Sequence, residues 1–112
     1  INPAGATVQM EGCIMMGLGY ALTEETRFGA GELRDTNFDT YTLPRFSWIP
    51  RIETVIVPAD DSPPQGGGEP AIIVMGGVLA NAIYDATGAQ LDQLPMTAPR
   101  VKAALAAAAR VG

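Results

Sequence analysis

Only one stretch of this chain has the pattern of a convincing β-strand, and this shortage of strands most constrains the fold. In residues 51–57, RIETVIV, β-branched and polar side chains alternate between two faces. Residues 37–43, NFDTYTL, predict a second, short extended segment, and residues 28–36 predict a turn or short hairpin. So few strands do not make a stable sheet alone. We therefore expect them to pair with another chain or with polypeptide outside these 112 residues.

Three segments predict helices. Residues 6–25 and residues 71–87 each carry apolar side chains every three or four positions, which is the spacing of one helix face. Pro70 suits the first turn of the second helix and Gly88 suits its end. A last helix is expected from an N-cap at Thr97 to about residue 110. The predicted fold class is α+β, with helices packed on a small partial β-sheet.

The first helix contains three glycines, Gly12, Gly17 and Gly19. Each destabilises a helix interior by ~1 kcal/mol relative to alanine, so their presence requires a reason. One interpretation is close packing against another helix. The other is that a bulky group, such as a cofactor, lies against the helix.

The composition excludes several kinds of site. Histidine is absent and Cys13 is the single cysteine, so the chain holds no histidine-dependent catalytic triad, no internal disulfide and no multi-cysteine metal site. We name no metal-ligating residue: Cys13 is interpreted as core, and the pair Asp60–Asp61 as a solvated turn rather than a cation site. The net charge of −5 argues against a nucleic-acid partner. No apolar run reaches the ~18 residues of a membrane span.

The loop QGGGEP, residues 65–70, is the most informative stretch for chemistry. Three consecutive glycines allow the backbone to approach a ligand closely and expose N–H groups. Glu69 follows them at the predicted start of a helix, where a carboxylate can act as a simple cap. The alternative is a general base in a pocket, with a pKa raised by burial.

Near the start of the first helix lie Gln9 and Glu11. The side-chain amide of Gln9 offers two donors and an acceptor oxygen, which suits the edge of a heterocycle. The alternative is that both residues are simply solvated at a helix end.

Several motifs, in matching order and spacing, together resemble the C-terminal part of the molybdopterin-binding large subunit of the xanthine dehydrogenase/aldehyde oxidase family. The branch that looks most similar is that of the isoquinoline 1-oxidoreductase β-subunit. The motifs cover nearly the whole chain: INP at 1–3, QMEG at 9–12, GLGYALTEE at 17–25, YTLP at 41–44, IPRI at 49–52, GGGEP at 66–70 and ANAIYDATG at 80–88.

This resemblance implies that residues 1–112 are the C-terminal part of a molybdopterin cofactor-binding domain. The implied activity is molybdenum-dependent oxidation of an N-heterocycle or an aldehyde, with water as the oxygen donor. Glu69 is implied to be the catalytic base. Gln9 and Gly12, from the family's Gln-x-Glu-Gly segment, and the loop glycines Gly67 and Gly68 are implied to contact the cofactor. Gly67 stands where the family often has Val or Ile, a departure that loosens the loop.

The resemblance also implies partners. The cofactor is molybdopterin, with a cytosine dinucleotide form as one option, and the iron–sulfur clusters lie in a small partner subunit. The rest of the large subunit completes the pocket for a small-molecule substrate, so we expect the isolated segment to be inactive. The compartment stays open between cytoplasm and periplasm, and the resembled branch favours the periplasm. Two alternatives stay open: a non-catalytic binding or assembly module, and a structural domain whose glycine loop only caps a helix.

Overall fold

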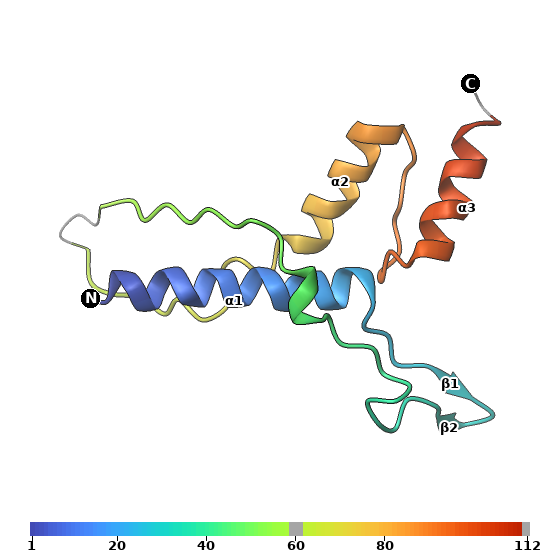
Figure 1. Ribbon diagram of the computed structural model, residues 1–112, viewed down its shortest axis with the longest axis horizontal. Coiled ribbons are helices and arrows are strands. Elements are labelled where there is room, and N and C mark those ends of the chain that lie inside the picture. Colours follow the sequence, from blue (N-terminus) through green and yellow to red (C-terminus); the bar gives the residue numbers. More distant parts are fainter. Residues whose placement is uncertain (59–61, 111–112) are drawn as a thin grey trace.

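A computed structural model describes residues 1–58 and 62–110 and has the expected α+β composition (Figure 1). Three α-helices, one short 3₁₀-helix and a two-stranded antiparallel sheet make up the described chain. Their order is α1 (Pro3–Leu22), β1 (Phe28–Gly29), β2 (Glu32–Leu33), η1 (Phe46–Trp48), α2 (Met75–Thr87) and α3 (Ala98–Ala108). None of the described helices is long and apolar enough to cross a membrane.

Helix α1 begins earlier than predicted, at Pro3 instead of residue 6. The cause is local, because the side-chain oxygen of Asn2 accepts a hydrogen bond from the backbone N–H of Gly5 at 3.0 Å. Asn at the N-cap followed by Pro in the first turn is a strong start signal. The helix ends at Leu22, where the N–H of Thr23 donates to the carbonyl of Gly19.

The prediction of an extended segment at residues 37–43 is wrong. Residues 37–41 form a turn, in which the N–H groups of Thr40 and Tyr41 donate to the carbonyl of Asn37 at 3.2 and 3.0 Å. The side chain of Asn37 also accepts from the N–H of Phe38. Such local hydrogen bonds compete with strand formation, and the aromatic–threonine pattern concealed them. The hairpin expected within residues 28–36 is confirmed, with Phe28 opposite Leu33.

Residues 51–57 do not form the predicted strand. They run extended in Figure 1, but within the described chain no second strand lies beside them. Ile52 and Thr54 are half-buried whereas Val55 is 85% exposed, so the alternation of the sequence survives without a partner. A strand is defined by its pairing, and pairing is what this segment lacks.

Helix α2 begins at Met75 rather than at residue 71. Two successive turns precede it, in which the N–H of Ile72 donates to the carbonyl of Glu69 at 3.1 Å and the N–H of Met75 to the carbonyl of Ile72 at 3.2 Å. These turns satisfy the backbone groups that a helix would have used. The predicted end is confirmed, since Gly88 adopts the left-handed conformation with φ 71°.

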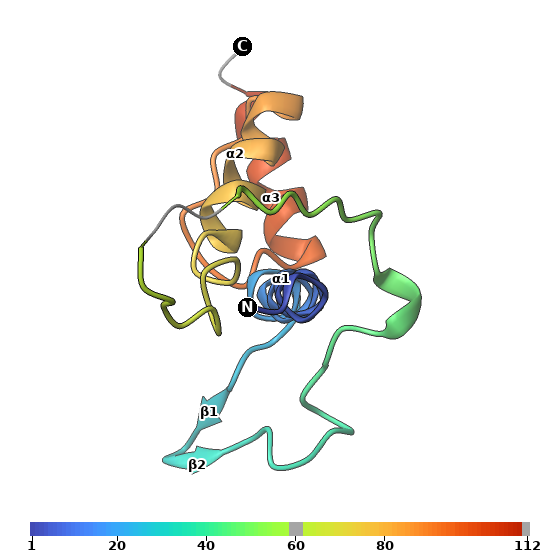
Figure 2. The ribbon, with the colours of Figure 1, turned by 90° about the vertical axis from the view of Figure 1, so that its left-hand side faces the viewer.

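Helix α3 follows Thr97, as predicted, although the Thr97 hydroxyl makes no capping hydrogen bond. The segment before α3 fixes it to the end of α1. The N–H of Met96 donates to the carbonyl of Ala21 at 2.7 Å, and the Arg100 guanidinium pairs with the Glu25 carboxylate at 2.6 Å. Figure 2, which views α1 end-on, shows α2 and α3 on one side of it and the hairpin on the other.

The described chain has a thin core. Its buried apolar side chains are few, and no large side chain is fully buried. The radius of gyration is 17.5 Å, against about 13 Å for a compact domain of this length. Many large apolar side chains are exposed, among them Val8, Met16, Phe28, Phe38, Phe46, Val55, Val57 and Ile73. Apolar surface on this scale is typical of an element that packs against further polypeptide.

Candidate functional site

The glycine loop is fastened to α1 at the carbonyl oxygen of Gly68. The side-chain amide of Gln9 donates to this oxygen at 2.6 Å, and the thiol of Cys13 donates to it at 2.8 Å. The same Gln9 nitrogen lies 3.6 Å from the Cys13 sulfur. A carbonyl oxygen has two lone pairs and accepts both donors. The sequence-predicted residues Gln9 and Gly68 are therefore in direct contact.

A second hydrogen bond holds the same segment four residues further on. The phenol of Tyr20 donates to the carbonyl oxygen of Ile72 at 2.5 Å. Gln9, Cys13 and Tyr20 are separated by four and seven residues, which places them on one face of α1. Glu69 lies between the two attachment points.

Glu69 does not occupy a helix N-terminus, so its interpretation as a helix cap is wrong. It lies in the turns before α2, six residues ahead of Met75, and its side chain is exposed. The dipole of the following helix therefore does not reach its carboxylate. Its assignment as a general base stays a prediction, and groups outside the described residues would have to bury it.

The glycines fall into two classes; the close-packing interpretation is confirmed for Gly17 and Gly19, and the cofactor interpretation stays a prediction for Gly12. A Cβ atom added to Gly17 would lie 2.7 Å from the Cβ of Met75, and one added to Gly19 would lie 3.0 Å from the Cδ of Pro44. These two glycines serve close packing. By contrast, a Cβ added to Gly12 or to any of residues 66–68 would have no neighbour within 4 Å. Open backbone at these positions leaves room for a ligand to approach.

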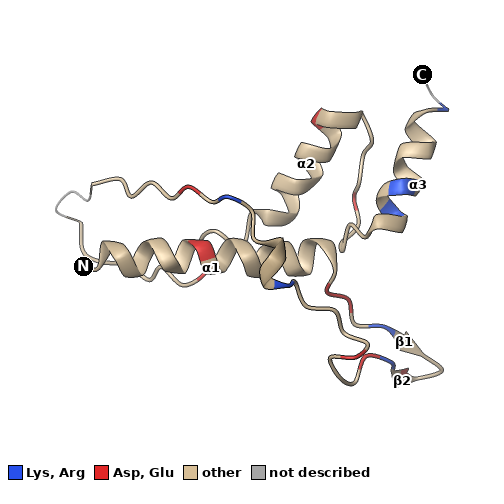
Figure 3. Cartoon of the chain, viewed as in Figure 1, with Lys and Arg blue, Asp and Glu red and all other residues tan. Residues whose placement is uncertain are grey.

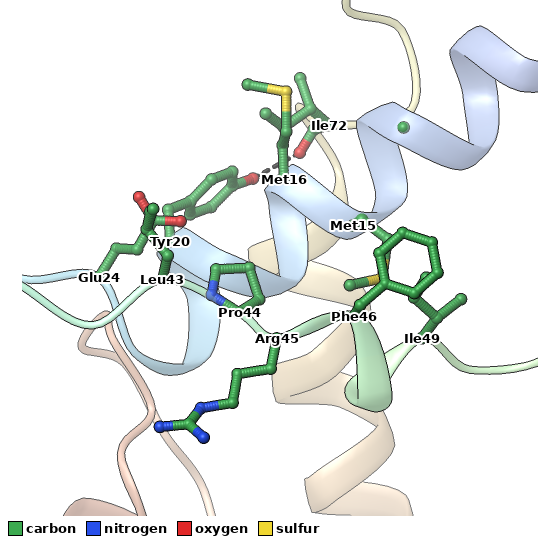
Figure 4. Close-up of a pocket in the computed structure, with 11 residues that line it drawn as sticks. Met15, Met16, Tyr20, Glu24, Leu43, Pro44, Arg45, Phe46, Ile49 and Ile72 are labelled. Atoms are coloured by element: carbon green, nitrogen blue, oxygen red, sulfur yellow. Dashed lines mark hydrogen bonds between the residues drawn. The ribbon is translucent and has the colours of Figure 1, made fainter. Parts of the chain in front are cut away.

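Next to this segment, α1 and residues 43–49 enclose an open, mainly apolar groove of about 580 Å³ (Figure 4). It is lined by Gly12, Met15, Met16, Tyr20, Glu24, Leu43, Pro44, Arg45, Phe46, Ile49 and Ile72. At one end the phenol of Tyr41 donates to the Glu24 carboxylate at 2.7 Å, and this hydrogen bond raises the pKa of Tyr41. The groove has the size of a small-molecule site.

Helices α1 and α2 carry few charged residues (Figure 3). Within α1 the single charged residue is Glu11, and within α2 it is Asp85. In the described part of the chain, no three His, Cys, Asp or Glu side chains gather where they could hold a metal ion. The pair Asp60–Asp61 lies outside the described residues. What the site offers is an amide, a carboxylate and peptide groups, which suit an organic ligand held by hydrogen bonds.

Sequence reasoning missed two members of this arrangement. Cys13 was interpreted as core, and it is buried at 3% exposure, but its thiol also binds the loop. Tyr20 was not singled out. Its distance of eleven residues from Gln9, three helical turns, was the available signal, although spacing alone does not reveal what the face contacts.

The sequence of this chain is similar to segments of known proteins. Residues 1–50 match the family model described as "Molybdopterin cofactor-binding domain". The chain is 34% identical to a nicotinate dehydrogenase polypeptide of Pseudomonas putida over 105 residues, 94% of this chain and 9% of that protein. It is 36% identical to the β-subunit of the isoquinoline 1-oxidoreductase of Brevundimonas diminuta over 95 residues, 85% of this chain and 12% of that protein.

A solved structure is similar as well. Quinoline 2-oxidoreductase from Pseudomonas putida 86 superimposes with a TM-score of 0.78 at 25% identity, over 95% of this chain and 14% of the other. The chain thus spans about a tenth of the length of the relatives it matches.

Proposed function

We propose that this chain, which is similar to a segment of the molybdenum-binding large subunits of the xanthine dehydrogenase family, forms part of a molybdenum hydroxylase. The substrate class is an N-heterocycle or an aldehyde, and water is the oxygen donor. Relatives named for nicotinate, isoquinoline and aldehyde oxidation support this class. Residues 1–112 would be the C-terminal part of the cofactor-binding domain.

One observation carries the proposal: the amide of Gln9 contacts the carbonyl of Gly68 directly. This hydrogen bond joins residues of two motifs, 59 positions apart in the sequence, that the resemblance assigns to the same site. Glu69 is the next residue, so a carboxylate stands beside the open backbone of the glycine loop.

The residues present fit a bulky organic cofactor. Molybdopterin, when bound, supplies the redox centre at which the substrate is oxidised. The Oε1 atom of Gln9 has no donor among the described residues and is available to the cofactor's N–H groups. Gly12, Gly67 and Gly68 carry no side chain that would block its approach. The resemblance assigns the proton-accepting role to the Glu69 carboxylate, which stands beside this open backbone.

The finer assignments belong to the same proposal. The cofactor would be molybdopterin, with its cytosine dinucleotide as one form, and iron–sulfur clusters would lie in a small partner subunit, since a single cysteine cannot hold one. The rest of the large subunit would cover the exposed apolar side chains of this segment. Periplasmic localisation stays a prediction.

Metal analysis of the assembled protein tests the proposal. We expect near-stoichiometric molybdenum and reduction of the metal by an N-heterocycle or an aldehyde. A fully matured assembly without molybdenum would contradict the proposal and support the alternative, a non-catalytic module with the family fold.

A further inference from the structure

Glu69 is fixed in space by its backbone alone. Its side chain is exposed and makes no hydrogen bond or ion pair within the described chain, so its position follows from the peptide units on either side of it. The backbone is attached to α1 at Gly68, directly before Glu69, through Cys13 and Gln9, and at Ile72, three residues after it, through Tyr20. The Ile72 N–H in turn donates to the carbonyl of Glu69 itself.

We propose that Cys13 and Tyr20 are positioning residues for Glu69, which they act on by holding residues 68–72 along one face of α1. This inference rests on the proposed function for its catalytic meaning, although the attachment is a property of the chain itself. The hydrogen bonds of Cys13 and Tyr20 to the segment go to main-chain carbonyls, so neither residue is assigned a chemical step.

The local packing explains why two attachment points are sufficient. Between Cys13 and Tyr20 the helix presents Gly17, whose missing side chain lets Met75 and Ile72 pack directly on the α1 backbone. Met75 is buried, so the start of α2 cannot move away from α1 without exposing it. The segment therefore has one packed end at residues 72–75 and one hydrogen-bonded end at Gly68.

The hydrogen bond from Cys13 is significant because the glycine loop can otherwise adopt many backbone conformations. A Cβ added to any of residues 66–68 would have no neighbour within 4 Å. The carbonyl of Gly68, the last of the three glycines, is held to α1 by Gln9 and Cys13. The thiol is buried at 3% exposure, where a satisfied donor is worth more than at the surface.

The test uses the assembled, molybdenum-loaded protein and the double variant Cys13→Ala/Tyr20→Phe. We expect the amide hydrogens of Ile72 and Met75, which donate to the carbonyls of Glu69 and Ile72, to exchange roughly tenfold faster, in line with the loss of two hydrogen bonds. Turnover per molybdenum should fall roughly 10- to 100-fold with little change in KM, because a displaced catalytic group lowers kcat. Cys13→Ser keeps a hydrogen-bond donor, so its exchange rate and its turnover should lie closer to wild type than those of Cys13→Ala. Tyr84→Phe, which removes a hydroxyl that makes no hydrogen bond within the described chain, is the matched control and should leave both unchanged.

Other outcomes separate the two proposals. Wild-type exchange and turnover in the double variant would overturn the positioning role while leaving the molybdenum hydroxylase assignment intact. If the double variant fails to fold, single Tyr20→Phe still decides, since it removes one hydroxyl: faster exchange at Ile72 supports the role and unchanged exchange overturns it. A protein without molybdenum would remove the proposed function, and the exchange measurement would still test the attachment.

Discussion

The side-chain amide of Gln9 lies 2.6 Å from the carbonyl oxygen of Gly68, although 59 residues separate the two in sequence. This contact makes α1 the support on which the glycine loop rests. A substitution in the N-terminal half of α1 should therefore affect Glu69, although the hairpin and the extended segments separate the two in sequence.

Replacing Gln9 by alanine should reduce cofactor retention more than it slows chemistry. The amide both anchors Gly68 and leaves its oxygen free. In the assembled protein, where the cofactor and the rest of the subunit would cover this exposed contact, the loss of such a partner costs ~1–3 kcal/mol. The measurement is molybdenum per protein beside turnover per molybdenum. Gln90→Ala, at an exposed position, is the control. Full molybdenum content with lost turnover would show that the assigned role is wrong.

Two glycines of α1 should respond to alanine in opposite directions. Gly17→Ala places a methyl group against Met75 and should destabilise the protein by ~1–3 kcal/mol. Gly12→Ala meets no neighbour within 4 Å and should stabilise the cofactor-free protein by up to ~1 kcal/mol through helix propensity. Denaturant unfolding of both variants without cofactor checks this. If Gly12 faces the cofactor, Gly12→Ala should also lower molybdenum content, and equal destabilisation by both would refute the distinction.

The hairpin should open at acid pH. Arg27 donates to both carboxylate oxygens of Asp35 and holds the pKa of this carboxyl below its ordinary value of about 4. A carboxyl with a lowered folded pKa stabilises the fold above its unfolded pKa, and this contribution is lost as the pH falls through the folded value. NMR signals of residues 27–35 should therefore shift together below about pH 4. Asp35→Asn should abolish the transition, and a pH-independent hairpin would contradict the account.

Residues 1–112, prepared alone, should self-associate. Exposed Phe46, Val55 and Val57 leave apolar surface that a soluble monomer seldom tolerates, and residues 51–57 present an unpaired extended edge. Light scattering should give a mass above 11.7 kDa that rises with concentration, together with binding of an apolar dye. A monodisperse monomer without dye binding would show that the surface is not adhesive.

The features predicted correctly from sequence are those set by short-range chemistry. Gly88 ends α2 because the left-handed conformation suits glycine, and Thr97 precedes α3 because proline follows in its first turn. The glycine loop and Gln9 were singled out by residue type and by family resemblance.

What sequence reasoning missed depends on contacts across the fold. The strand at residues 51–57 has the right alternation, but a strand needs a neighbour that the described chain does not supply. Helix α2 starts late because turns at residues 69–75 satisfy the backbone first. Cys13 is both buried and hydrogen-bonded to the loop. Its place on an apolar helix face predicts the burial but not the hydrogen bond.

The central claim is that Glu69 is the proton acceptor of a molybdenum hydroxylase, and reduction of the metal by substrate in a single turnover of Glu69→Gln tests it most directly. Gln is nearly isosteric with Glu, so fold and molybdenum content should survive. General-base catalysis accelerates a reaction by ~10²–10⁴-fold. We therefore expect the rate of metal reduction to fall by at least ~100-fold. Reduction at the wild-type rate, with normal molybdenum content, would contradict the account.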